Sequence, residues 1–204
     1  MPKISVTRGK GVLEAFLAKK RTRLACSLLS SMDERDKLLD IGCGRFPYFL
    51  TVIDFRYKVG IDKHTGGEIQ SSLCGRDIHF ICADLEKNPA LPLENESVNA
   101  VTLLAVIEHL DIATTRKILS ECHRVLTRNG RIVITTPNAW TRPLLNFLAQ
   151  VGLVSPEEIK EHRTYYYLSL LETIITEAGF LPETIKVGTF ECGCNLWGTA
   201  QKQS

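Results

Sequence analysis

The stretch Lys37-Leu-Leu-Asp-Ile-Gly-Cys-Gly44 decides the fold class of this chain. Its apolar run predicts a short buried strand. The two glycines predict a turn in which the backbone adopts φ > 0 or passes close to a ligand. Two later apolar runs, Val59-Gly-Ile-Asp62 and Ile78-His-Phe-Ile-Cys-Ala-Asp84, also end on an acid. The three acids stand at equal steps of 22 residues, at positions 40, 62 and 84, which is about the length of one strand-helix unit.

The rest of the chain continues this alternation of strands and helices. We expect helices at 11–30, 46–53, 112–126, 143–151 and 166–178, and strands at 37–41, 58–61, 78–82, 98–104, 131–136, 183–191 and 195–201. Such an order predicts an α/β fold, with a mostly parallel sheet that carries helices on both faces. Ligands of these sheets bind outside the carboxyl ends of the strands, beside the first strand. Asp40, Asp62 and Asp84 would therefore meet at one rim of the sheet.

Length and composition favour one soluble domain. The chain has 204 residues, of which 44% are hydrophobic and 24% charged, and this suits a single domain with a full core. No apolar run approaches the roughly 18 residues of a membrane span, and the first ten residues lack the apolar core of a secretory signal. The seven cysteines are odd in number and scattered. We therefore expect reduced thiols and a cytoplasmic protein.

Charge is unevenly distributed, although the net charge is only +2. Residues 1–23 contain seven lysines and arginines but a single acid, Glu14, so that this segment carries +6 and the remainder −4. One interpretation is a basic arm that attracts an anionic substrate. The other, which we favour, is the solvated face of an amphipathic helix.

Six short motifs in a fixed order resemble the class I S-adenosylmethionine-dependent methyltransferases, in the ubiquinone-biosynthesis-like or type 11 group. The motifs are Leu38–Gly44, Val59–Asp62, Ala83–Leu85, Val106–Leu110, Glu121–Gly130 and Ile134–Asn138. The resemblance implies a Rossmann-like sheet of seven strands, mostly parallel, with an antiparallel last strand. It also implies S-adenosyl-L-methionine as the cofactor. One departure is Phe46, at a position where the family often has a third glycine.

The resemblance assigns cofactor-binding roles to eight positions. Gly42 and Gly44 would let the backbone approach the methionine portion, and Asp40 would reach its ammonium group through water. Asp62 would accept both ribose hydroxyls, because one carboxylate can take two donors. Of the remaining four positions, Asp84 and the Leu85 amide would bind the adenine. The carbonyl of Leu104 or Ala105 would accept from the ammonium group. An isolated aspartate after a strand is more often a helix N-cap, but three at equal steps favour binding.

His109 is the candidate catalytic base, since it follows the fourth strand, where the family places the transferring methyl. Imidazole has a suitable pKa for taking a proton near neutrality; the alternative is a structural histidine. We expect Glu108 to be structural.

Relatives that bind a divalent ion carry Glu-x-x-Glu-His here, whereas this chain has Ala105 at the first position. Loss of that oxygen ligand weakens a magnesium-like site, so we predict no metal, although Glu108, His109 and His162 remain a partial ligand set.

Acceptor specificity is expected in two segments of the single domain 1–204. One is the helical arm at 1–30, and the other is a lid-like insert at 139–167. Candidate acceptor-binding residues of the insert are Trp140, Arg142, His162 and Tyr166, because aromatic rings pack flat ligands and arginine holds anions. At least one of the three tyrosines at 165–167 must instead point into the core.

The predicted function is S-adenosylmethionine-dependent methyl transfer, by in-line displacement, to an oxygen or nitrogen of a small-molecule or lipid- or sugar-linked acceptor. A basic arm would suit an anionic acceptor. RNA methylation is a less favoured alternative, because the whole chain is not strongly basic. A non-catalytic cofactor-binding module of the same fold is a third. A nicotinamide dehydrogenase is disfavoured, since Pro47 interrupts the Gly-x-Gly-x-x-Gly pattern.

Overall fold

A computed structural model describes residues 12–33, 36–45, 47–64, 78–143, 153 and 162–203. The helix expected at 143–151 and the Gly66-Gly67 segment lie outside the described residues, apart from residue 143. The helices are α1 (Val12–Leu29), α2 (Tyr48–Val52), α4 (Ile112–Val125) and α7 (Leu168–Glu177), with short 3₁₀ turns η1 (Ile107–His109), η2 (Ala139–Thr141) and η3 (Pro182–Thr184). The strands are β1 (Lys37–Ile41), β2 (Tyr57–Asp62), β3 (Ile78–Cys82), β4 (Val98–Leu104), β5 (Leu126–Pro137), β6 (Lys186–Phe190) and β7 (Asn195–Gln201).

The strands form one sheet in the order β3-β2-β1-β4-β5-β7-β6. The first five in this order pair in parallel, and β7 runs antiparallel to both β5 and β6. This confirms the predicted Rossmann-like sheet of seven strands with an antiparallel last strand. The strand order reverses between β1 and β4, so the carboxyl ends of these two strands flank the position at which such sheets bind ligands.

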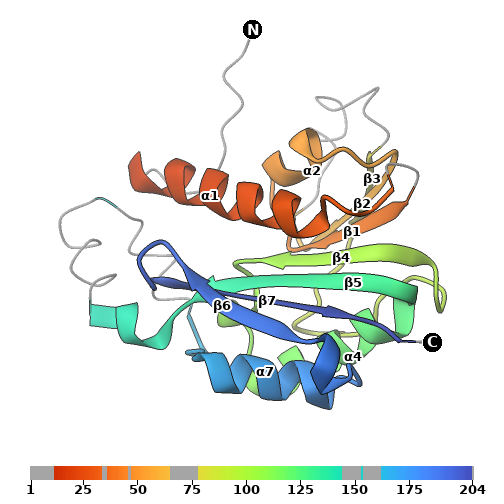
Figure 1. Ribbon diagram of the computed structural model, residues 1–204. Coiled ribbons are helices and arrows are strands. Elements are labelled where there is room, and N and C mark those ends of the chain that lie inside the picture. Colours follow the sequence, from red (N-terminus) through yellow and green to blue (C-terminus); the bar gives the residue numbers. More distant parts are fainter. Residues whose placement is uncertain are drawn as a thin grey trace, which may run out of the picture.

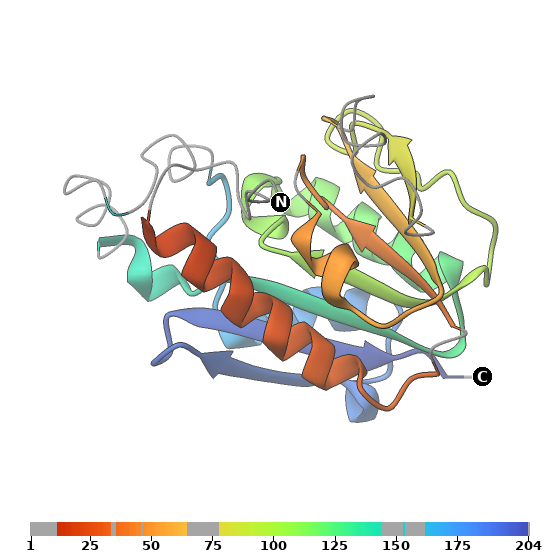
Figure 2. The ribbon, with the colours of Figure 1, turned by 90° about the horizontal axis from the view of Figure 1, so that it is seen from above.

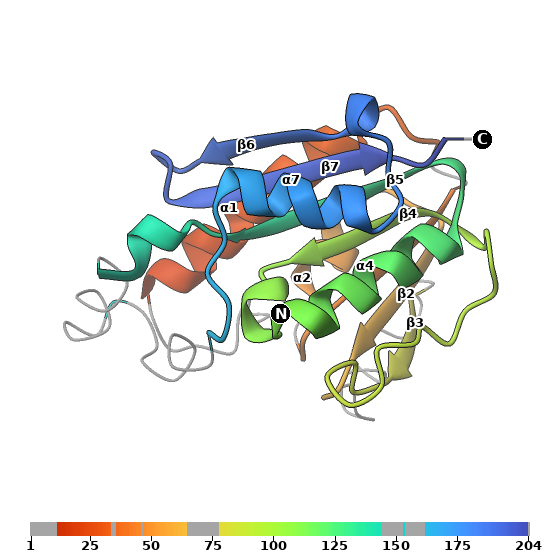
Figure 3. The ribbon, with the colours of Figure 1, turned by 90° about the horizontal axis from the view of Figure 1, so that it is seen from below.

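Helices cover both faces of the sheet, as predicted (Figure 1). Helices α1 and α2 lie on one face; seen from above, α1 runs across the strands β4 and β5 (Figure 2), with which it is in contact. Helices α4 and α7 lie side by side on the opposite face (Figure 3). The fold is thus a three-layer sandwich in which the sheet is buried on both sides.

Side-chain alternation along the strands divides the core into two clusters. In β1, Leu38 packs into the cluster beneath α1, whereas Leu39 and Ile41 pack into the larger cluster beneath α4 and α7. In β5, Val133 belongs to the α1 side and Ile134 to the other. Strands buried on both faces explain why these segments read as continuous apolar runs.

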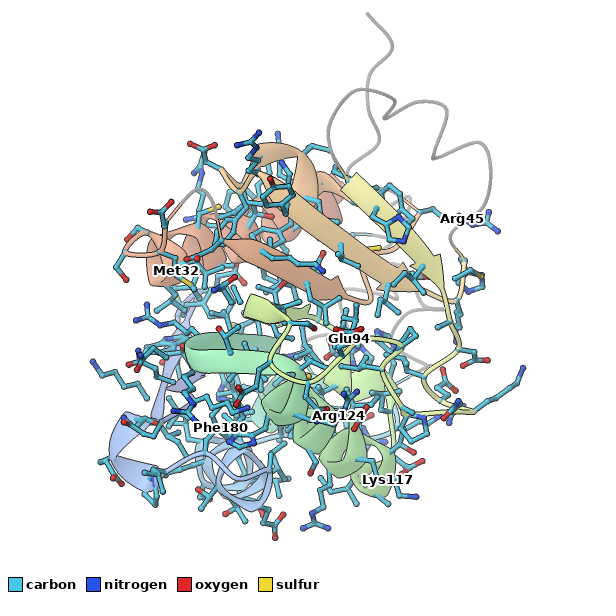
Figure 4. The ribbon with its side chains drawn as sticks, turned by 90° about the vertical axis from the view of Figure 1, so that its right-hand side faces the viewer. Met32, Arg45, Glu94, Lys117, Arg124 and Phe180 are labelled. Carbon is cyan, nitrogen blue, oxygen red and sulfur yellow. The ribbon has the colours of Figure 1, made fainter. Side chains whose placement is uncertain are left out.

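The start of α4 and the loop before β4 are fixed by polar contacts. Asp111 caps the helix by accepting a hydrogen bond from the Thr114 N–H at 2.8 Å, as aspartate at an N-cap commonly does. Near the other end of the helix, Arg124 donates to the carbonyls of Leu91 and Leu93 at 3.0 and 2.9 Å. Figure 4 shows Arg124 on α4, on the side of the molecule where Glu94 lies.

Several element boundaries differ from the prediction, among them the sixth strand, which spans Lys186–Phe190 rather than 183–191. Two of the differences have a local cause. The fifth strand begins at Leu126 rather than 131, because Leu126 pairs with Val98 ahead of an irregularity in the ladder. Asn129 lies within this strand with φ of +63°. The last helix begins at Leu168 rather than 166, since Tyr166 forms a bridge with Asn138.

No helix within the described part of the chain is long and apolar enough to cross a membrane.

Candidate active site

The glycine turn after β1 depends on its two glycines. Gly42 and Gly44 have φ of +71° and +68°, a left-handed conformation that residues with a Cβ rarely adopt. The Gly42 N–H donates to the carbonyl of Ile61 at 2.7 Å, which ties the turn to β2. A Cβ at Gly42 would lie 2.4 Å from Val106 Cγ2. The turn is therefore packed directly against the loop that follows β4.

Asp40 lies at the end of β1 and is almost completely buried, with 4% of its surface exposed. Thr102 of β4 donates a hydrogen bond from Oγ1 to Asp40 Oδ1 at 2.6 Å. Burial raises the pKa of Asp40 to about 7; the Thr102 hydrogen bond opposes this shift, and the Asp62 charge adds to it. Asp40 thus changes charge near neutral pH.

Asp62, the last residue of β2, connects the glycine turn to the next loop. Its Oδ2 accepts the N–H of Gly44 at 2.9 Å, and its Oδ1 accepts the N–H of His64 at 2.8 Å. A carboxylate offers about four lone-pair sites, so a side chain of this kind at the end of β2 can accept several donors at once, as binding of ribose hydroxyls requires.

Asp84 and Leu85 begin the loop after β3. Asp84 Oδ1 accepts the Glu86 N–H at 3.2 Å, and Lys87 Nζ lies 3.2 Å from Asp84 Oδ2. The Lys87 hydrogen bond is the main cause that holds the pKa of Asp84 below its usual value. The Leu85 side chain is buried in the core, with 9% exposed, and this anchors the loop.

Leu104 ends β4, and Ala105 follows it in a strained conformation. Ala105 has φ of +59°, which is uncommon for a residue with a Cβ and is found disproportionately at functional sites. Its N–H donates to the carbonyl of Thr135 at 3.0 Å. The chain therefore turns sharply here, at the carboxyl end of the central strand.

Glu108, His109 and His162 come together beyond β4, although His162 is distant in the sequence. One ligand atom from each of the three side chains lies within 4.8 Å of the others, and the two imidazole rings meet edge-on with centroids 5.1 Å apart. The backbone N–H groups of Arg163 and Thr164 both donate to the Glu108 carbonyl, at 2.8 and 3.2 Å. These hydrogen bonds hold the last part of the insert against the rim.

Glu108 is buried, with 3% of its surface exposed, and accepts a hydrogen bond from Thr136 Oγ1 at 3.1 Å. Burial raises the pKa of this carboxyl, and the charge of His162 is the largest opposing effect. Glu108, His109 and His162 would supply one oxygen and two nitrogen ligands. That set suits zinc-like ions better than magnesium, which prefers oxygen.

The candidate acceptor-binding residues of the insert have different environments. Trp140 is 56% exposed and donates from Nε1 to the Gly193 carbonyl at 3.0 Å. The Arg142 guanidinium lies 4.7 Å from the centre of the Tyr165 ring. Tyr166 does not fit the expected role, because its side chain is completely buried and its hydroxyl bonds with Thr115 at 3.1 Å. It is the tyrosine of the 165–167 run that packs into the core.

Two features of this rim had no signal in the sequence motifs. Thr102 is the hydrogen-bond partner of Asp40, yet an isolated threonine inside an apolar strand carries no signature; only the predicted pairing of β1 with β4 could have suggested it. Glu191 lies in the turn between β6 and β7 with φ of +53°. A sequence without a known sheet order does not place that turn beside the rim.

The residues present fit an adenosyl cofactor. A turn with two glycines, a buried acid at β1 and further acids at the ends of β2 and β3 follow one another along the carboxyl rim of a doubly wound sheet. This fold and this rim are those that the resemblance to class I S-adenosylmethionine-dependent methyltransferases implies.

Residues 39–134, slightly less than half of the chain, match the family described as "Methyltransferase domain". This match, together with the fold, supports an S-adenosylmethionine-dependent methyltransferase of the type 11 group. No curated protein was found to match the sequence.

Solved structures of low sequence identity share the fold. A possible histamine N-methyltransferase of Thermotoga maritima has a TM-score of 0.63 at 16% identity, with 94% of this chain and 96% of that one covered. A putative methyltransferase, solved in complex with the Haloferax volcanii Trm112 activator, has a TM-score of 0.67 at 14% identity, with 96% of this chain and 99% of that one covered. Phosphoethanolamine N-methyltransferase 2 of Haemonchus contortus, solved with S-adenosylhomocysteine, has a TM-score of 0.68 at 14% identity, with 91% of this chain and 53% of that one covered.

Proposed function

We propose that the protein transfers the methyl group of S-adenosylmethionine to an oxygen or nitrogen of a small-molecule or lipid- or sugar-linked acceptor. The observation that carries this proposal is the position of His109, in the turn directly after β4 and in edge contact with His162. An imidazole at the end of the central strand is suited to accept the proton that a hydroxyl or ammonium acceptor loses.

The cofactor would bind along the rim from β4 to β3. Asp62 accepts the ribose hydroxyls, and Asp84 with the Leu85 amide meets the adenine. Asp40 and the carbonyl of Leu104 or Ala105 face the methionine ammonium group. Gly42 and Gly44 let this portion approach the backbone. The sulfonium methyl is already activated, so the chief task of the protein is to align the acceptor with the S–CH₃ bond.

A small acceptor is favoured over RNA by the charge of the chain. The net charge is +2, whereas a nucleic-acid-binding domain usually carries a strongly basic surface. The backbone hydrogen bonds from Arg163 and Thr164 to Glu108 keep the chain folded against the acceptor side of the rim. The phosphoethanolamine N-methyltransferase that shares the fold acts on a small polar amine, which is consistent with this class of acceptor.

The experiment that tests this function incubates the protein with a metabolite extract and cofactor labelled in its methyl group. Mass spectrometry should find the label in a small molecule, together with S-adenosylhomocysteine. Label in added RNA, and RNA binding that weakens steeply with salt, would instead establish the RNA alternative. Bound cofactor without any labelled product would favour a non-catalytic module.

Binding of the cofactor should weaken as the pH falls through 7. The pKa of Asp40 is raised to about 7, so the carboxyl is neutral below that pH and charged above it, and only the charged form attracts an ammonium group. We expect the Kd for S-adenosylhomocysteine to rise by up to about tenfold per pH unit below 7, measured by calorimetry from pH 5.5 to 8. The control is Asp40→Asn, which cannot ionise and should give a flatter profile. A wild-type profile as flat as that of Asp40→Asn would remove Asp40 from ammonium binding.

Methyl transfer should not require a metal ion. Glu108, His109 and His162 provide one oxygen ligand, and Ala105 stands where metal-binding relatives have a second acid. Turnover should therefore remain within about twofold of its initial value after treatment with EDTA and gel filtration. Activity that disappears with EDTA and returns with magnesium, manganese or zinc would overturn this prediction.

A further inference from the structure

Two buried polar atoms near the rim, Glu191 Oε1 and Thr135 Oγ1, have no hydrogen-bond partner among the residues that the structure describes. Glu191 lies in the turn between β6 and β7, and Thr135 lies on β5. The Thr135 side chain is completely buried, with 0% exposed, and the Glu191 residue is half-buried. Leaving such a group unsatisfied destabilises a protein, and few occur in a folded protein. An apolar side chain of similar shape would avoid this cost.

The sheet register brings these two groups to the same face. Thr135 and Pro137 lie on the same side of β5, and Pro137 pairs directly with Asn195 of β7. The Asn195 side chain in turn donates to Glu191 Oε2. Thr135 and Asn195 are thus diagonal neighbours, which long side chains can span. The second oxygen of the same Glu191 carboxylate is the one without a partner.

This face is also the one on which the cofactor acid lies. Asp40 pairs with Thr102, and Thr102 pairs with Val133, so all three side chains point toward α1. Thr135 follows two residues after Val133 along β5 and shares its direction. The unsatisfied groups therefore lie on the cofactor's side of the sheet, beyond β4 and away from the ribose and adenine positions on β2 and β3.

Helix α1 carries positively charged side chains that act on Glu191. Figure 2 shows α1 crossing this face of the sheet. Burial raises the pKa of Glu191, while the charges of Arg21 and Lys20 on α1 lower it. The Arg21 charge also lowers the pKa of Glu108, so Arg21 acts on both carboxyls. These positive charges offset the negative charge of Glu191. The surroundings of Glu191 can therefore take either a neutral hydrogen-bond donor or a cationic amine.

We propose that Glu191 and Thr135 form an acceptor-recognition subsite that binds a hydroxyl or amine group of the methyl acceptor. Glu191 Oε1 accepts a hydrogen bond from that group, and Thr135 Oγ1 completes the contact. A carboxylate only accepts, so Glu191 favours a group that carries a donor over one that lacks it, such as an ether. This inference rests on the proposed function and narrows its acceptor to a molecule with a second polar group besides the methylated atom.

The test measures binding, with the protein saturated with S-adenosylhomocysteine. The probes are butan-1-ol, butylamine and methyl propyl ether, of which the alcohol and the ether are isomers. Ligand-observed NMR titrations give their Kd values for the wild type, Glu191→Gln and Thr135→Val. We expect the alcohol, the amine or both to bind at least about fivefold more tightly than the ether, and to lose this advantage in Glu191→Gln. Comparison of the butan-1-ol and butylamine titrations shows whether the subsite prefers a neutral or a cationic donor.

Two further measurements distinguish a role of Glu191 and Thr135 in acceptor recognition from a structural role. The affinity for S-adenosylhomocysteine should be unchanged in both variants, and Thr135→Val should melt at the wild-type temperature or above, because it removes an unsatisfied hydroxyl. Equal binding of all three probes, or an alcohol and amine preference that persists in Glu191→Gln, would overturn the proposal. Failure of the wild type to bind S-adenosylhomocysteine would instead count against the proposed function itself.

Discussion

Asp62→Ala should weaken cofactor binding by about 1.5–3 kcal/mol, or roughly 10- to 150-fold in Kd. The substitution would remove the two charge-assisted hydrogen bonds to the ribose that we propose for this carboxylate. It also frees the N–H of Gly44 and the N–H of His64, which both donate to Asp62 in the structure. The glycine turn and the loop after β2 would lose their common anchor. The measurement is calorimetric titration of the purified variant with S-adenosylhomocysteine.

Asp54→Ala is the matched control for this prediction. Asp54 is an exposed aspartate in the loop between α2 and β2, so its replacement should leave the Kd within about twofold of the wild type. A second variant, Asp62→Asn, retains the shape of the side chain and separates loss of charge from collapse of the turn. If Asp62→Ala binds the cofactor as tightly as Asp54→Ala does, Asp62 is not part of the site.

His109→Ala should lower kcat by about 10²–10⁴-fold, the usual contribution of a general base, with the cofactor Kd within about twofold of the wild type. The imidazole lies after the central strand, beside His162 and the buried Glu108, and no cofactor contact is assigned to it. The rate is measured as formation of S-adenosylhomocysteine with the acceptor identified by isotope labelling.

His79→Ala serves as the control, since His79 is an exposed histidine on β3. A pH-rate profile adds a readout that a purely structural histidine would not change: the wild-type rate should fall as His109 becomes protonated, and this limb should disappear in His109→Ala. Wild-type rates in His109→Ala would make it a structural residue. A falling limb that remains in His109→Ala but vanishes in His162→Ala would transfer the role of base to His162.

Most of the fold follows from local sequence patterns. The strands at 37–41, 78–82, 98–104 and 195–201 have the bounds that their apolar runs predict, because a strand buried on both faces needs continuous hydrophobic side chains. The equal spacing of Asp40, Asp62 and Asp84 indicated consecutive strand-helix units. Parallel pairing of β1, β2 and β3 then brings their ends to one rim.

The contacts that complete the site depend on the three-dimensional order of the strands. Thr102 reaches Asp40 only because β4 pairs with β1, 62 residues away along the chain. Tyr166 was predicted to bind the acceptor, but its bridge to Asn138 and the hydrogen bond with Thr115 fix it in the core. A run of three tyrosines does not reveal which ring points inward. The proximity of Glu191 to the rim likewise follows from β7 lying between β5 and β6.

The most direct test of the account is a crystal structure of the protein with S-adenosylmethionine or S-adenosylhomocysteine. We expect the ribose hydroxyls to contact the Asp62 carboxylate and the adenine to lie beside Asp84. The methionine portion should pass over Gly42 toward Asp40. A fully occupied ligand at another place, or one at this rim whose ribose makes no contact with Asp62, would contradict the account.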